Sequence, residues 1–253
     1  LLDTQSVLAR RNAVWTLTRI GTAAALAAAR SALDDADPSV RLVAGRCAAT
    51  HRDTAAVEQL VRLFRDPEPA VRREAATALG RIGSVAAAPA LLQAFEYADD
   101  RILEHAIIYA LIELNDPQPI RAQLSNPSTR VRRAALVALD QMEKSELTRE
   151  WITPLLQTDD VRLLEAVVDV VGRHPEWVEV VTGLLIEWLL DPEATVGRRE
   201  RLYDAVYALR RQPTCQELMA ELLSRPATPT QARMLLLDVM IDSGFREFPV
   251  VWQ

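Results

Sequence analysis

The side chains best suited to acid–base or metal chemistry are three histidines, and their spacing supports neither. His105 lies in the run Glu104-His105-x-x-x-Tyr109, so a helix would place His105 and Tyr109 one turn apart. His51 and His174 lie far away, and the sequence contains no His-x-x-x-His or Glu-x-x-His pair with the spacing of zinc ligands on a helix. No nucleophile or paired carboxylate accompanies His105, as general acid–base catalysis requires. We therefore expect His105 in the packing or on a binding surface.

The other potential nucleophiles are isolated as well. Cys47 and Cys215 form no Cys-x-x-Cys or metal-binding pattern. Cys47 falls inside a predicted helix, which favours a small buried residue. Ser84 and Ser145 have no glycine-flanked turn or partner histidine, and no glycine-rich loop is present to hold a phosphate. The sequence therefore predicts no catalytic residue, no cofactor and no metal ligand.

The charge of the chain limits its partners. The net charge is −6, the isoelectric point is about 5.3, and Lys144 is the only lysine among 29 basic residues. Nucleic-acid-binding domains usually carry a basic excess, so we expect no nucleic-acid partner. The apolar run 178–190 contains two glutamates and a threonine. It falls short of the roughly 18 residues of a membrane span, so we expect no membrane insertion by this segment.

A repeat determines the elements that carry these residues. The run 66–83 recurs at 8–21 and at 126–139, with weaker copies that begin near residues 37, 99 and 159. One apolar position marks each copy, with separations of 31, 31, 31, 29 and 30 between Ala9, Val40, Val71, Ile102, Val131 and Val161. A fixed period of this length is typical of stacked supersecondary units that bury their apolar faces against one another. About eight such units fill residues 1–253 as a single predicted domain.

Each unit is predicted to contain two helices. Asp37 is suited to cap the second helix, with Pro38 at its first position, and a glycine such as Gly83 ends it. In this second helix the core positions recur at helical spacing, as Val71, Ala75, Leu79 and Ile82. The first helices are the apolar runs 55–64, 86–95, 151–156 and 178–190, and the last pair is 215–223 with 231–241. The sequence thus predicts an all-α protein.

This pattern resembles the HEAT repeat family in its short bacterial, lyase-type form. The residues that carry the resemblance are Asp66-Pro67, Val71-Arg72, Ala75-Ala76, Ala78-Leu79 and Gly83, with their equivalents. The resemblance implies a right-handed α-solenoid of antiparallel helix pairs, as in HEAT and armadillo proteins. It also implies that the repeated arginines bond turn residues such as Asp37 and Asp66 of neighbouring units, at Arg41, Arg72, Arg132 and Arg162.

A narrower resemblance concerns the segments 12–20, 102–113 and 132–142. They look like the HEAT region of large planctomycete proteins that have a dehydrogenase-like β-propeller before it and a c-type cytochrome after it. The resemblance implies a helical spacer of an exported, periplasmic redox protein, and otherwise we expect a cytoplasmic one. Neither propeller nor haem motif is present in this sequence. Large apolar residues without a polar cap occupy 245–252, so we expect the natural protein to continue.

The most consistent function is a non-catalytic scaffold that binds a protein, or flanking domains of its own chain, through a concave face lined by the second helices. A helical wheel places ten candidate residues on that face: Arg11, Trp15, Arg46, Arg73, Thr77, Glu104, His105, Ile108, Arg133 and Val137. Two alternatives stay open, the redox spacer and a lyase-like or glycosylase-like enzyme. A lyase would need a tetrapyrrole-sized cavity, and a glycosylase a basic face with a buried aspartate and tryptophans.

Overall fold

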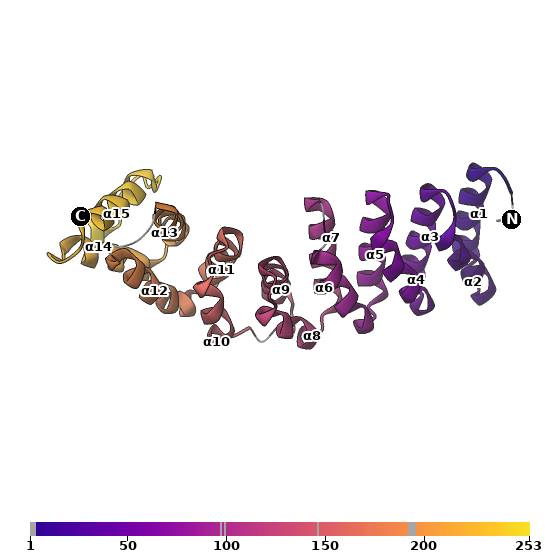
Figure 1. The fold of residues 1–253 in the computed structure, drawn as a ribbon, viewed down its shortest axis with the longest axis horizontal. Helices are drawn as coiled ribbons and strands as arrows, with labels where there is room; N and C mark the ends of the chain where they lie inside the picture. Colours follow the sequence, from indigo (N-terminus) through magenta and orange to yellow (C-terminus); the bar gives the residue numbers. More distant parts are fainter. Residues whose placement is uncertain (1–3, 97, 99, 146, 192–195) are drawn as a thin grey trace. The chain divides into compact units, whose positions relative to one another are not determined.

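The chain forms α-helices joined by short 3-10 helices and turns, as a computed structural model shows (Figure 1). The structure describes residues 4–96, 98, 100–145, 147–191 and 196–253, and no β-strand occurs among them. The all-α prediction is confirmed. The contacts divide the chain into two compact units, residues 1–146 (unit 1) and residues 147–253 (unit 2), and each is described by itself. A single solenoid over the whole chain stays a prediction.

Unit 1 contains nine α-helices in its described part. They are α1 (Val7–Ile20), α2 (Ala23–Ser31), α3 (Pro38–His51), α4 (Val57–Arg62), α5 (Pro69–Ile82), α6 (Ala88–Glu96), α7 (Arg101–Leu114), α8 (Pro117–Arg121) and α9 (Thr129–Gln141). The odd-numbered helices are the predicted second helices, and each packs on the next odd-numbered helix. The even-numbered first helices are shorter, and 3-10 turns extend α2, α4 and α8 at their carboxyl ends.

Unit 2 repeats this plan with three further pairs. Its helices are α10 (Arg149–Ile152), α11 (Val161–Arg173), α12 (Val178–Leu190), α13 (Val196–Leu209), α14 (Pro213–Ser224) and α15 (Thr230–Asp242). The carboxyl-terminal segment folds back onto α14, because the Trp252 indole donates a hydrogen bond to the Gln216 carbonyl at 3.0 Å and packs edge-on against Phe245. In the described residues of both units, no helix has the length and apolar character that a membrane span requires.

Local sequence signals set the helix ends. The Asp37 side chain accepts a hydrogen bond from the Ser39 amide at 2.9 Å, so the predicted cap of α3 is confirmed. Asp100 and Asp160 cap α7 and α11 in the same way. Gly83 ends α5 with a φ of 74°, a left-handed conformation that glycine adopts without a steric cost. The four predicted core positions of α5 are all buried, namely Val71, Ala75, Leu79 and Ile82.

The register of two repeats differs from the sequence prediction. Ile102 was expected to occupy the core position of Val71, but its side chain is 63% exposed, and Leu103, 3% exposed, lies in the core instead. The reason is that α7 begins at Arg101 and therefore reaches its third helical position, the position of Val71 in α5, at residue 103. Val161 is exposed for a similar reason, because it is the first residue of α11. Ala9 occupies the third position of α1, as predicted. Its side chain is exposed because α1 is the first helix in the row.

The predicted arginine ladder is confirmed for Arg41 and Asp66, whereas Asp35 takes the place that was predicted for Asp37. Arg41 donates two hydrogen bonds to the Asp66 carboxylate, from Nε to Oδ2 at 2.7 Å and from Nη2 to Oδ1 at 2.9 Å. Arg10 makes the same paired contact with Asp35, at 2.7 and 2.9 Å. Each bond joins the start of one second helix to the turn before the next, and such bidentate pairs are the strong form of the interaction. Arg41 additionally donates to the Asp35 carbonyl, so successive rungs are linked.

Arg72 holds its own turn as Arg41 does, because it donates to the carbonyl oxygens of Asp66 and Pro67. The later predicted arginines differ from this pattern. In Arg132 the buried Nε has no hydrogen-bond partner in the described structure. Arg162 is exposed, so its predicted place in the ladder is wrong. Because α11 begins at Val161, the ladder position falls on Leu164, which is buried.

The ladder makes unit 1 sensitive to acid. The hydrogen bond from the Arg10 guanidinium lowers the pKa of Asp35 in the folded state. A carboxylate with a depressed pKa contributes stability that is complete above its unfolded pKa of about 3.9 and is lost as the pH falls through the lower folded pKa. We expect the free energy of unfolding to fall below about pH 4, measured by urea unfolding followed by circular dichroism. The free energy of unfolding of the Arg10→Gln variant should fall less steeply as the pH decreases. Equal slopes for this variant and the wild type would show that the Arg10–Asp35 pair does not cause the acid sensitivity.

Candidate interaction surface

The ten predicted site residues lie on five neighbouring helices of unit 1, α1, α3, α5, α7 and α9. We call these residues the second-helix stripe. Trp15, Arg46 and His105 are exposed, and the seven others are half-buried. The structure thus places all ten at least partly at the surface of consecutive helices. Their role in binding stays a prediction.

Ion pairs cross the stripe from helix to helix. Arg46 Nε lies 3.1 Å from Glu74 Oε2, which links α3 to α5. Glu104 of α7 receives two arginines of α9, with Arg130 at 2.6 Å and Arg133 at 2.9 Å.

A longer ion pair joins Arg73 to Asp100, the cap of α7, at 3.7 Å. With these contacts, every described arginine of the stripe except Arg11 faces a carboxylate. The stripe is therefore close to electrically neutral and is not a row of free cations of the kind that binds phosphates.

Two aromatic side chains provide large exposed apolar groups, Trp15 within the stripe and Tyr109 of α7, which we add to the stripe. Trp15 of α1 is 44% exposed and Tyr109 of α7 is 50% exposed. With α7 in its observed register, Tyr109 takes the position that Thr77 has in α5, and His105 takes the position of Arg73. Tyr109 was absent from the predicted set because the period was counted from Ile102. Counting from the helix cap Asp100 would have found it.

The other candidate groups have structural surroundings. His51 is hydrogen-bonded through Nε2 to the Thr18 carbonyl at 2.8 Å, and its ring packs against Gly21. Cys47 is buried, as predicted, and burial raises the pKa of its thiol. Burial raises the pKa of the Cys215 thiol to about 12. A thiol reacts as its thiolate, so neither cysteine is a poised nucleophile near neutral pH. No cluster of three His, Cys, Asp or Glu side chains suited to a metal ion occurs in the described part of the chain.

Unit 1 also contains a hollow of about 680 Å³ between first and second helices. Three arginines line it, Arg62, Arg65 and Arg72, together with apolar groups such as Phe64 and Leu103. Arg62 also faces carboxylates, with Asp34 at 3.6 Å and Glu58 at 3.8 Å. The described lining includes no histidine, thiol, hydroxyl or carboxylate.

Comparison with known proteins agrees with the geometry of unit 1. Residues 26–112, which lie within unit 1, match the family model of HEAT repeats. A comparison with curated protein sequences found no match.

Similar solved structures include an archaeal HEAT-like repeats protein from Thermococcus onnurineus NA1, with 15% identity over 99% of this chain and 100% of that chain, and a TM-score of 0.47. The complex of CpcE and CpcF of phycocyanin lyase from Nostoc sp. PCC7120 has 21% identity over 96% and 91% of the two chains, and a TM-score of 0.45. Human deoxyhypusine hydroxylase in complex with glycerol has 21% identity over 95% and 91%, and a TM-score of 0.36. At these values the likenesses carry no argument about function.

Proposed function

We propose that this chain is a non-catalytic scaffold and that unit 1 binds a protein segment across the second-helix stripe. The observation that carries the proposal is the exposure of Trp15 and Tyr109 on the same row of helices as the paired arginines. Tryptophan, tyrosine and arginine are the residues that most often dominate the binding energy of protein interfaces. The partner is another protein or a flanking domain of the same chain.

The ion pairs of the stripe support this function because they fix its side chains in advance. Arg133 is held by Glu104, and Arg46 by Glu74, before any partner arrives. A preorganised surface loses less side-chain freedom on binding, which leaves more of the contact energy as affinity. Since the charges are balanced, the stripe fits a segment of mixed charge that offers apolar groups to Trp15 and Tyr109. It does not fit a polyanion.

A catalytic role has less support from the chemistry of the described residues. The hollow of unit 1 has the volume for a sizeable ligand, but the described residues of its lining provide no general acid, base or nucleophile. The buried thiols and the absence of convergent metal ligands in the described residues point the same way. A lyase-like activity would therefore need catalytic groups other than the described lining of this hollow and the two buried thiols. The narrower resemblance to the propeller and cytochrome proteins stays a prediction.

The test is to select binding segments from a peptide display library on the intact chain and to measure their affinities for variants of the stripe. We expect Trp15→Ala and Arg73→Glu each to weaken binding by tenfold or more, about the effect of losing an interface hot spot. Val85 is a matched control, because it is a similarly exposed apolar residue that begins a 3-10 turn outside the five stripe helices. Unchanged affinity in both stripe variants, or an equal loss in Val85→Ala, would remove the stripe as the site.

A further inference from the structure

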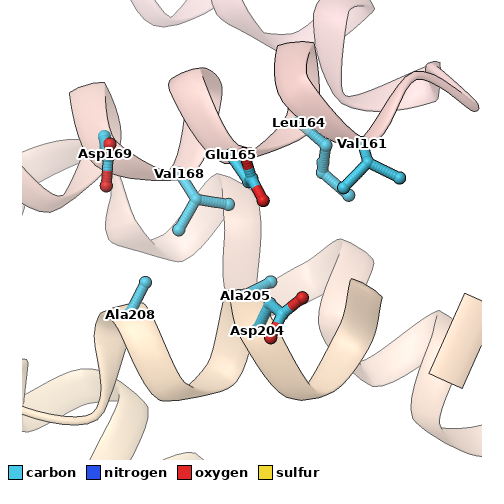
Figure 2. A pocket seen from close by; sticks show the side chains of 8 residues that line it. All are labelled: Val161, Leu164, Glu165, Val168, Asp169, Asp204, Ala205 and Ala208. Atoms are coloured by element: carbon cyan, nitrogen blue, oxygen red, sulfur yellow. The ribbon is translucent and has the colours of Figure 1, made fainter. Parts of the chain in front are cut away.

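Unit 2 contains a surface of different chemistry between α11 and α13. The two helices enclose a hollow of about 240 Å³ whose apolar part includes Leu164 and Val168. Figure 2 shows three carboxylates at this gap, with Glu165 and Asp169 on the α11 side and Asp204 on the α13 side. All three are exposed at the surface. The hollow therefore combines an apolar floor with acidic walls.

The acidic surface continues to the next helix. Asp204 also lines a second hollow, of about 650 Å³, in which residues of α13 and α15 take part. Glu200 and Asp238 add two carboxylates there, and Met234 adds an exposed apolar side chain. Arg199 is the cation among its described lining residues. We call the two hollows, which share Asp204, the acidic groove.

In the described part of the chain, the carboxylates of the first hollow lack partners of opposite charge. Within the described structure, no hydrogen bond or ion pair reaches Glu165, Asp169 or Asp204. This differs from the stripe of unit 1, where carboxylates face arginines. Glu165 and Asp169 are also one helical turn apart, a spacing at which like charges repel. A bound cation would relieve that repulsion.

The distribution of charge along the chain reinforces the contrast. Residues 1–146 contain 18 basic and 18 acidic side chains, whereas residues 147–253 contain 11 basic and 17 acidic ones. The whole negative balance of the chain thus belongs to unit 2. Apart from Arg199, the described charges that line the groove are negative, and a cleft lined mainly by one sign of charge concentrates ligands of the opposite sign.

The chemistry of the groove selects among possible cations. These carboxylates do not form a group of three that could hold a metal ion. The apolar side chains between them are an unsuitable surface for a small hydrated cation, but they fit a chain whose cationic groups alternate with apolar ones. We propose that the acidic groove binds a basic amphipathic segment of a partner protein, with lysine or arginine against Glu165, Asp169 and Asp204 and apolar side chains on Val168 and Met234. This site is separate from the stripe and does not depend on it.

The experiment uses the full chain and a labelled probe peptide with lysine and leucine at helical spacing. Fluorescence anisotropy should show saturable binding of this peptide. A version with glutamate in place of lysine should not bind, and a version with serine in place of leucine should bind at least about tenfold more weakly. Failure of the lysine and leucine peptide to bind, or equal binding of the glutamate version, would overturn the proposal.

A matched pair of triple variants locates the site. Glu165→Gln with Asp169→Asn and Asp204→Asn should weaken binding at least about tenfold. The control, Glu187→Gln with Glu217→Gln and Glu221→Gln, removes the same charge from exposed positions of α12 and α14 and should leave affinity within about twofold. Equal weakening by both triples would mean general attraction to unit 2 and would overturn the proposal. Sedimentation that shows wild-type self-association lost only in the groove triple would assign the groove to a second copy of the chain instead.

Discussion

The Asp66→Asn variant is expected to lose about 3–5 kcal/mol of the free energy of unfolding, the usual effect of breaking a buried ion pair by removing one partner. The side chains of Arg41 and Asp66 are only 11% and 4% exposed, and their two hydrogen bonds are 2.7 and 2.9 Å long. Asp66 Oδ1 accepts a hydrogen bond from the Glu68 amide at 2.9 Å, and an asparagine keeps an oxygen for this bond. It presents an amide donor to the guanidinium, so the buried Arg41 loses its hydrogen-bonded counter-charge.

Asp34 provides the matched control on the surface of unit 1. It faces Arg62 at 3.6 Å, and both side chains are more than half exposed. Exposed pairs contribute little, so Asp34→Asn should change the free energy of unfolding by less than about 1 kcal/mol. Urea unfolding followed by far-UV circular dichroism measures both variants. Similar small losses at both positions would show that the ladder does not stabilise unit 1.

The Gly80→Ala variant is expected to destabilise unit 1 by about 2 kcal/mol, within the usual range for overpacking. A Cβ at Gly80 would lie 2.7 Å from Ala110 Cα, so α5 and α7 are in contact at their backbones there. Alanine favours the helix by about 1 kcal/mol over glycine. That gain offsets only part of the cost, because a backbone atom of the facing helix cannot rotate away from the new methyl group.

Gly45 of α3 tests this reasoning with the same substitution. Its added Cβ would meet Glu74 Cγ at 3.2 Å, a side-chain atom that has to move by only a few tenths of an ångström. We expect Gly45→Ala to change stability by less than about 1 kcal/mol in either direction, since helix propensity and crowding nearly cancel. The measurement is again urea unfolding. If Gly80→Ala proves as mild as Gly45→Ala, the helices are less tightly packed than the structure indicates.

The sequence by itself determined the repeat, the helical class and the main core face of unit 1. These features depend on interactions within a few residues, which a local pattern contains. Asp37 caps its helix with its own side chain, and Gly83 ends α5 because its backbone adopts a left-handed conformation. The burial of Val71 and its neighbours follows from the helical period. Arg41 could be recognised as a structural residue because it recurs in register.

Tertiary structure decided the features that depend on distant parts of the chain or on small changes in loop length. The turn before α7 moves the helix start relative to the repeat, which buries Leu103, exposes Ile102 and brings Tyr109 to the surface. A one-residue change of this kind rotates a helix face by roughly 100°. The acidic groove joins Glu165 to Asp204, residues far apart in the sequence that only the packing of α11 on α13 brings together. Periodicity shows which face of each helix is apolar, but helix packing decides which exposed side chains share a surface.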